Sequence, residues 1–171
     1  SMSLHKETLP AALEPILSQN TRKSVTDHEL YDYLLSEQTN MGALLELAKS
    51  GSSKDLTLLS FSLLKFTEAI AQRSPHDILE CVQRYLAKIL QEKNADYGNS
   101  FSKAIDVFGF PVVLVRVYDK LNRLLNLMED KKDIQVEDES TSDTLIDLFG
   151  YLTLTRYEFI RRCVGSEKAE Q

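Results

Sequence analysis

The chain of 171 residues is long enough to bury a core, and its 43% hydrophobic and 27% charged residues are typical of a folded globular protein. Its formal net charge of −6 and its pI near 5.1 argue against a protein that binds duplex DNA or an anionic membrane through a basic surface. Small phosphorylated ligands stay open, because local cations or a metal ion can offset the overall charge.

Cysteine and histidine usage indicates neither a disulfide framework nor a zinc site. Cys81 and Cys163 both lie in amphipathic helical patterns and are expected to be reduced core thiols, and the three histidines lack the spacing of zinc ligands. The sequence has no apolar run of about 18 residues and no signal-peptide pattern, so we expect a soluble cytoplasmic protein.

The beginning of the chain predicts two helices. Residues 9–17 have a helical apolar pattern that Pro15 interrupts. Thr26 and Glu29 have the spacing of a capping box, in which each side chain binds a backbone N–H of the first turn. They predict a helix that ends at about Glu37.

Two further helices are expected before residue 74. Residues 41–50 predict a short helix that Gly51 ends. Ser53 is the expected cap of a helix over residues 54–73, and the apolar residues on all sides of this helix indicate that it is buried.

The sequence SPHD at residues 74–77 is a strong helix start, because it combines a capping residue, a proline at the first helical position and an acid in the first turn. Apolar residues then recur every three or four positions as far as Leu90. The sequence NADYGNS at residues 94–100 interrupts this pattern.

Pro111 begins the next expected helix, in which one apolar stripe continues to Met128. The β-branched residues of PVVLVRVY, residues 111–118, would also suit a strand, but the unbroken stripe favours a helix. A charged linker follows at residues 129–139.

Ser140 and Asp143 have the spacing of a second capping box, and they predict a long helix that runs to about Cys163 and ends at Gly165. The sequence contains no convincing β-hairpin, βαβ pattern or internal repeat. We therefore expect an all-α helical bundle. Its expected parts are an N-terminal helical section at residues 5–74, a helical core at residues 75–164 and a flexible tail at residues 165–171.

Two aspartates, Asp143 and Asp147, lie one turn apart on the last expected helix, on a side that also carries Gly150 and Tyr151. Two carboxylates that point the same way repel each other unless a cation lies between them, and Mg²⁺ or Mn²⁺ suits such oxygen ligands. Capping of the helix explains Asp143 equally well, whereas Asp147 has no such local role. Glu139, one turn earlier, is either a third ligand or a charged linker residue.

A basic stripe is expected on the preceding helix, where Arg116, Asp119, Lys120 and Arg123 share one side. Three cations at this spacing could hold phosphate oxygens, with Asp119 orienting an arginine. The alternative is a solvated helix face with ion pairs within the helix.

A third polar cluster consists of Lys93, Asn94, Asp96 and Tyr97, at the end of an expected helix where Gly98 permits a positive φ. It is a candidate ligand site, and a helix C-cap followed by a turn is the alternative.

Three segments in order resemble the phage and bacterial family called nucleotide modification associated domain 1. They are KNADYGNSF at residues 93–101, RVYDKLNRLLNL at 116–127 and VEDESTSDTLIDLFGYLTL at 136–154. That family is more remotely similar to the MazG-like all-α nucleoside triphosphate pyrophosphohydrolases. The resemblance covers about residues 78–162.

The resemblance implies a helical bundle that binds a nucleotide, with acidic residues holding Mg²⁺ or Mn²⁺ around the triphosphate, and a homodimer or homotetramer. The implied metal ligands are Asp96, Glu139, Asp143 and Asp147. The implied substrate-binding residues are Lys93, Asn94, Tyr97, Arg116, Asp119, Lys120, Arg123 and Tyr151.

The chain departs from the pyrophosphohydrolases at the helix before the 94–100 interruption. Those enzymes carry the motif E-E-x-x-E there, whereas this helix has only Glu80 and Glu92, without that spacing. Metal binding by the last helix does not depend on this motif, but activation of a water for hydrolysis does.

Two functional hypotheses follow. The first is a metal-dependent nucleotide-binding protein that hydrolyses a nucleoside triphosphate between the α and β phosphates. The second is a non-catalytic helical module that binds a modified nucleotide or a protein partner. A helix-turn-helix regulator built on residues 26–73 is disfavoured, since this segment lacks a basic recognition helix.

Overall fold

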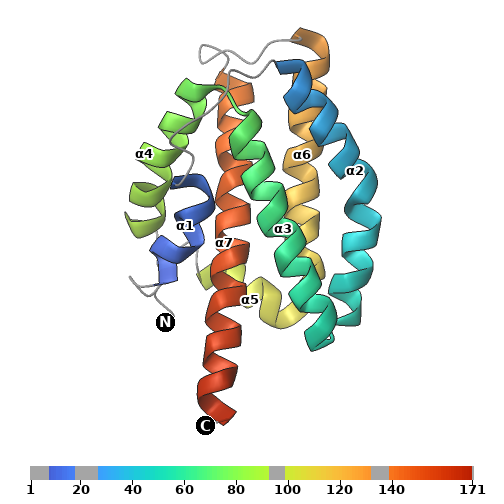
Figure 1. The fold of residues 1–171 in the computed structure, drawn as a ribbon, viewed down its shortest axis with the longest axis vertical. Coiled ribbons are helices and arrows are strands. Elements are labelled where there is room, and N and C mark those ends of the chain that lie inside the picture. Colours follow the sequence, from blue (N-terminus) through green and yellow to red (C-terminus); the bar gives the residue numbers. More distant parts are fainter. Residues whose placement is uncertain (1–7, 18–26, 93–98, 132–138, 171) are drawn as a thin grey trace.

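The computed structural model describes residues 8–17, 27–92, 99–131 and 139–170, and within these ranges it contains helices and no strands (Figure 1). The all-α prediction is therefore confirmed. The helices are α1 (Thr8–Leu17), α2 (Asp27–Ser50), α3 (Ser53–Arg73), α4 (His76–Glu92), α5 (Asn99–Phe108), α6 (Pro111–Lys131) and α7 (Glu139–Glu170). None of the helices, within the described ranges, has a stretch long and apolar enough to cross a membrane.

Four long helices form the central bundle. α2 contacts α3, α3 contacts α7, α7 contacts α6 and α6 contacts α2, so the four helices close a ring. α1 and α4 lie along the other side of α7, and the short α5 lies beside α6 (Figure 1). The boundary expected at residues 74/75 falls between α3 and α4, and helices from both sides of it build the same bundle.

The middle of α7 is buried on several sides because α1, α3, α4 and α6 all pack against it. Apolar residues spaced three or four apart form one buried side of α7, and further apolar residues on its other sides contact the remaining neighbouring helices. The buried apolar residues of α7 are Leu145, Leu148, Phe149, Leu152, Leu154, Tyr157 and Phe159.

Threonines also lie in this buried stretch of α7, and their hydroxyl groups bond to the helix itself. The Thr153 hydroxyl donates to the Phe149 carbonyl at 2.8 Å, and the Thr155 hydroxyl donates to the Tyr151 carbonyl at 2.7 Å. The hydroxyls therefore enter the core with hydrogen-bond partners, which removes most of the cost of burying them.

The prediction of two short helices before Gly51 is wrong in one respect, because α2 is continuous from Asp27 to Ser50. The polar residues in its middle fit a helix, since the hydroxyls of Ser36 and Thr39 donate to backbone carbonyls of the preceding turn. Gly51 ends the helix as predicted, with φ of 64° and its N–H bonded to the Leu47 carbonyl.

The start of α3 is displaced by one residue from the prediction. Ser52, not Ser53, is the N-cap, and its side chain accepts a hydrogen bond from the Asp55 N–H at 3.2 Å. The helix is also not buried on all sides, since Leu58 and Phe61 are exposed.

The sequence did not predict α5, which begins at Asn99, inside the stretch of residues 94–100 that was expected only to interrupt the helical pattern. Phe101 and Ile105, four residues apart, are its buried anchors, and Gly109 at φ 75° ends it. The Phe110 ring in the following turn stacks on Phe159 of α7, with centroids 4.2 Å apart. The α5–α6 corner is therefore packed against the central helix.

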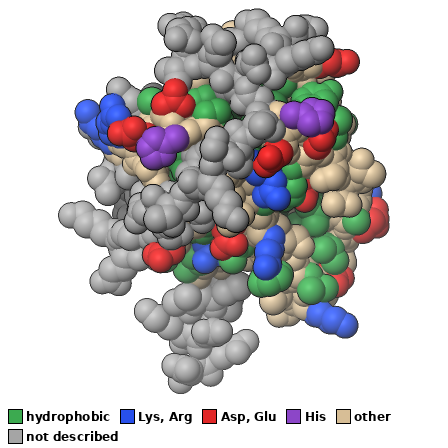
Figure 2. Space-filling model, turned by 45° about the horizontal axis from the view of Figure 1, so that its top comes forward, with side chains coloured by type: hydrophobic (Ala, Val, Ile, Leu, Met, Phe, Trp, Pro, Cys, Tyr) green, Lys and Arg blue, Asp and Glu red, His purple; other side chains and the backbone are tan. Residues whose placement is uncertain are grey.

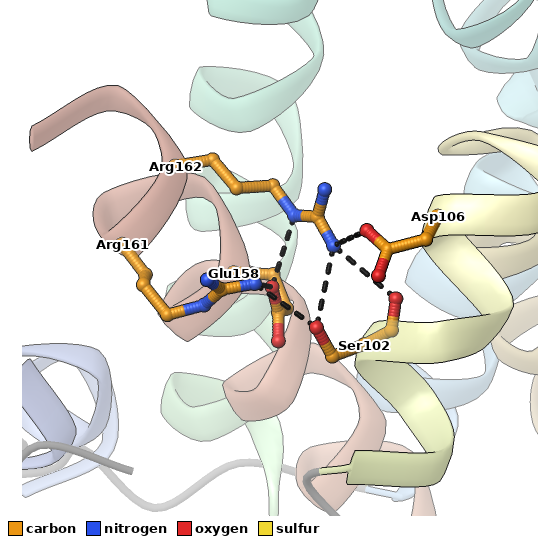
Figure 3. Close-up of polar contacts among 5 residues, drawn as sticks. All are labelled: Ser102, Asp106, Glu158, Arg161 and Arg162. Carbon is orange, nitrogen blue, oxygen red and sulfur yellow. Dashed lines mark hydrogen bonds and ion pairs between the residues drawn. The ribbon is translucent and has the colours of Figure 1, made fainter. Parts of the chain in front are cut away.

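A polar network holds α5 to α7 at the same end of the bundle (Figure 3). Glu158 is buried on α7, and its Oε2 atom accepts hydrogen bonds from Arg161 at 2.7 Å and from Arg162 at 3.0 Å. Both arginines also contact the buried Ser102 on α5, and Arg162 pairs with Asp106 at 2.8 Å. The buried carboxylate is thus paired with two cations, as a charge in an interior requires.

α6 begins at Pro111 and is helical throughout its β-branched run, as predicted. α7 begins at Glu139 and extends to Glu170, so Ser140 lies inside the helix and the predicted end at Gly165 is too early. Ser140 accepts at its backbone carbonyl from the Thr144 hydroxyl, a contact typical of a helix interior.

Candidate functional site

The basic stripe of α6 faces the acidic side of α7 along an antiparallel seam. The two helices are antiparallel, so each contact residue one turn further along α6 is paired with a residue one turn earlier on α7. We call the six residues that make the following three contacts the α6–α7 seam. Its contacts are Arg116 with the Tyr151 ring at 5.9 Å to the centroid, Lys120 Nζ with Asp147 Oδ2 at 3.0 Å, and Arg123 Nε with Thr144 Oγ1 at 3.3 Å.

The centre of the seam is the ion pair of Lys120 and Asp147. The Asp147 side chain is 51% exposed and the Lys120 side chain 28% exposed, so the pair lies at the surface. Asp147 therefore has a partner that the sequence pattern did not show, on another helix. An ion pair with this exposure contributes roughly 0.2–1 kcal/mol, so the fold does not depend on it.

Asp143 is exposed one turn before Asp147. Because α7 already begins at Glu139, Asp143 lies beyond the first turn, where neither capping nor the helix dipole explains an acid well. The two carboxylates thus share one side of α7, as the sequence predicted.

A divalent cation would find two of its four expected ligands in the described part of the chain. No group of three or more His, Cys, Asp or Glu side chains there is arranged to hold a metal ion. Asp96 lies outside the described residues, and the side chain of Glu139 is not described. Proteins bind Mg²⁺ with nucleotides through one or two carboxylates plus phosphate oxygens, so Asp143 and Asp147 fit a cation shared with a phosphorylated ligand.

Tyr151 already has packing partners on two elements. Its ring stacks on Phe101 of α5 with centroids 6.2 Å apart, and the Arg116 guanidinium lies 5.9 Å from its centroid. The Arg116 Nε atom is buried and has no hydrogen-bond partner among the described residues. Stacking of Tyr151 on a nucleobase stays a prediction. Three other expected substrate-binding residues, Lys93, Asn94 and Tyr97, lie outside the described residues.

A shallow open groove of about 420 Å³ runs along the C-terminal half of α6, next to the seam. Asp119 and Arg123 line it, as do three residues that the sequence analysis did not single out: Asn122, Asn126 and Leu127. Asn122 and Asn126 lie one turn apart in the segment RVYDKLNRLLNL, and this spacing in the sequence could have predicted that they share one side of the helix.

Asn122 also contacts the first long helix of the bundle. The Gln38 amide on α2 donates a hydrogen bond to the Asn122 Oδ1 atom. This contact joins residues far apart in the sequence, and no local pattern predicts it. It joins Asn122, which lines the groove, to α2.

A second polar cluster lies between α2 and α3. The Arg73 guanidinium lies 4.6 Å from the centroid of the Tyr33 ring, and that ring is 6.2 Å from Phe66. Burial raises the pKa of Tyr33, and the neighbouring Glu37 carboxylate raises it further. Burial also raises the pKa of Glu37, against the opposing effect of its hydrogen bond with Tyr33.

The face of the molecule drawn in Figure 2 carries mixed charge. In Figure 2, acidic, basic and apolar side chains are interspersed over the described parts of the face that it shows. This agrees with the net charge of −6.

Comparisons of the chain with protein-family models, with curated proteins and with solved structures found no match.

Proposed function

We propose that the chain binds a nucleotide at the α6–α7 seam together with Mg²⁺ or Mn²⁺, and that it hydrolyses a nucleoside triphosphate between the α and β phosphates. The observation that carries the proposal is the 3.0 Å contact between Lys120 and Asp147. It brings together, at an exposed surface, a cation and a carboxylate from two separate sequence segments.

A metal–triphosphate is a ligand that can replace this ion pair on both sides. Lys120 would turn to a phosphate oxygen, and Asp147, with Asp143 one turn away, would hold the metal ion. The exchange costs little, because exposed pairs contribute only roughly 0.2–1 kcal/mol. The bound metal would supply neutralisation of phosphate charge and polarisation of the attacked phosphorus.

The other candidate residues have roles in the same proposal. Arg116 and Arg123 flank Lys120 on α6 and would bind further phosphate oxygens, with Asp119 beside them to orient an arginine. Lys93 and Asn94 would join them, and Asp96 and Glu139 would complete the metal ligands. Tyr97 or Tyr151 would stack on the base.

The second candidate function is a non-catalytic module that binds a modified nucleotide or a protein partner. One observation favours it. α4 carries no E-E-x-x-E motif, and its exposed Glu80 pairs with Arg84 at 3.4 Å on the same helix. A homodimer or homotetramer, as the resemblance implies, is compatible with either function and stays a prediction.

The two functions are separated by measuring binding and turnover on the same protein. Thermal unfolding is followed with Mg²⁺ or Mn²⁺ and each of the common nucleoside triphosphates, and pyrophosphate release is assayed in parallel. A rise in the unfolding midpoint with pyrophosphate release supports the hydrolase, and a rise without release supports the binding module. No rise with any metal–nucleotide pair at millimolar concentration contradicts nucleotide binding altogether.

A further inference from the structure

Arg123, on the α6 side of the seam, is held through the Nε atom of its guanidinium. That atom donates a hydrogen bond to Thr144 Oγ1 on α7 at 3.3 Å. Among the described residues Arg123 forms no ion pair, so Asp119, one turn earlier on α6, does not orient it. Arg123 is exposed, and within the same residues the donors of its Nη groups stay available for a ligand.

Thr144 can hold another side chain because its own conformation is fixed. The residue is 2% exposed, and its hydroxyl donates to the Ser140 carbonyl one turn earlier. The hydroxyl hydrogen is thus used within α7, and a lone pair of Oγ1 accepts from Arg123. Because a threonine has few allowed rotamers in a helix, this acceptor keeps its direction.

Thr153, another buried threonine of α7, makes only the first of these two contacts. It is 1% exposed, and its hydroxyl donates to the Phe149 carbonyl at 2.8 Å, which satisfies the buried group. Among the described residues, no side chain donates to it. Burial therefore explains the bond from Thr144 to Ser140, but it does not explain the bond from Arg123 on another helix.

The contact of Arg123 with Thr144 lies next to the ion pair of Lys120 and Asp147. Arg123 follows Lys120 by three residues on α6, and Thr144 precedes Asp147 by three residues on α7. Three residues rise about 4.5 Å and turn by about 60° relative to each other, so both cations lie on the side of α6 that faces α7. A ligand with linked phosphate groups can bind both cations at once.

We propose that Thr144 is a positioning residue of this site, which holds Arg123 by its Nε atom so that the Nη groups form a fork for the phosphate next to the one that Lys120 binds. The ligand class that gains from this arrangement has at least two linked phosphate groups, since a monophosphate occupies the place at Lys120 alone. The inference rests on the proposed function, because it requires that the seam binds phosphate.

Loss of the Thr144 hydroxyl should act on the ligand through Arg123. A guanidinium without this contact is free to turn, and the ligand must then order it on binding. Ordering one flexible side chain corresponds to a loss of affinity of roughly two- to tenfold.

The test measures binding by calorimetric titration in Mg²⁺ to the full chain, Thr144→Val and Thr144→Ser. The probes are the common nucleoside triphosphate that binds the unmodified chain most tightly and the monophosphate of the same nucleoside. Thr153→Val is the matched control, because it removes a buried hydroxyl of the same helix that does not contact Arg123. The unfolding midpoint without ligand checks that each variant is folded, and Thr144→Ala replaces Thr144→Val if the latter does not fold.

Thr144→Val is expected to weaken triphosphate binding two- to tenfold and monophosphate binding less than twofold. Thr144→Ser, which keeps the hydroxyl, and Thr153→Val should bind both probes within twofold of the unmodified chain. In an Arg123→Met background, Thr144→Val should have no further effect on triphosphate binding, whereas a merely structural role would weaken binding in both backgrounds.

Two sets of results would overturn the proposal, and they are distinguishable. If the unmodified chain binds the triphosphate but Thr144→Val binds it equally well, or weakens it further in the Arg123→Met background, Thr144 does not position Arg123 and the proposed function stands. If the unmodified chain binds none of the nucleoside triphosphates, the proposed function fails and this inference fails with it.

Discussion

At the residue scale, the two aspartates of α7 differ more than their spacing suggested. Asp147 bonds to Lys120 on another helix, and Asp143 is exposed beyond the first turn of α7. The sequence predicted that both would lie on one side, because residues four apart on a helix always do. It could not predict the Lys120 contact, which depends on how α6 and α7 pack.

Removal of the lysine tests whether Asp147 is held for structure or for a ligand. Lys120→Met should lower the free energy of unfolding by less than about 1 kcal/mol, because the pair is partly exposed. It should weaken binding of a magnesium–triphosphate at least tenfold, because a phosphate-binding cation is lost. Urea unfolding and calorimetric titration measure the two effects. A large loss of stability with unchanged binding would assign the pair to the fold.

Glu37 predicts a pH dependence of stability. Burial raises its pKa in the folded protein, so the folded state holds the proton more strongly than the unfolded state. The stabilising contribution of protonated Glu37 is fully present below the pKa that Glu37 has in the unfolded chain. It is lost as the pH rises through the pKa that Glu37 has in the folded protein. Glu37→Gln should therefore raise the unfolding midpoint more at pH 7 than at pH 4.

Thermal unfolding of both proteins across this pH range measures the difference in midpoint. A difference that shrinks as pH rises would show that the Tyr33 hydrogen bond, which opposes the burial effect, dominates at Glu37.

At the element scale, α5 is the part that the sequence analysis missed. The residues before it looked like a plain turn, and with ten residues the helix is too short for its periodicity to be decisive. What holds it is non-local, namely the buried network of Glu158 and the stacking of Phe110 on Phe159. The long helices α6 and α7 were predictable because their apolar stripes continue over many turns.

Glu158 and Asp106 both bind Arg162, but replacing them by alanine should lower the free energy of unfolding by different amounts. Glu158 is 2% exposed, and Glu158→Ala should destabilise the chain by about 3 kcal/mol, because two cations lose a buried partner. Asp106 is 52% exposed, and Asp106→Ala should cost less than about 1 kcal/mol. Urea unfolding measures both, and equal costs would contradict the role assigned to Glu158 burial.

At the scale of the whole molecule, the sequence predicted the fold class but not the arrangement of the helices. The all-α class followed from helical spacing along the chain. The ring of α2, α3, α7 and α6 depends on contacts between distant residues, such as Gln38 with Asn122, which no local pattern shows. The same holds for the seam, where two separately predicted stripes prove to be neighbours.

In the proposed function, Asp147 binds a metal ion together with a triphosphate. The most direct measurement is the unfolding midpoint with magnesium and a nucleoside triphosphate, in the unmodified chain and in Asp147→Asn. Asp106→Asn is the control, because that carboxylate has nearly the same exposure, 52% against 51%, and also pairs with a cation across helices.

Ligand at about 100 times its dissociation constant stabilises the folded state by about 2.7 kcal/mol, which for a chain of this size is a shift of roughly 5–10 °C. We predict that shift for the unmodified chain and for Asp106→Asn, little shift with magnesium alone, and loss of the metal-dependent part in Asp147→Asn. An Asp147→Asn protein that is folded and shifts as much as the unmodified chain would contradict the claim.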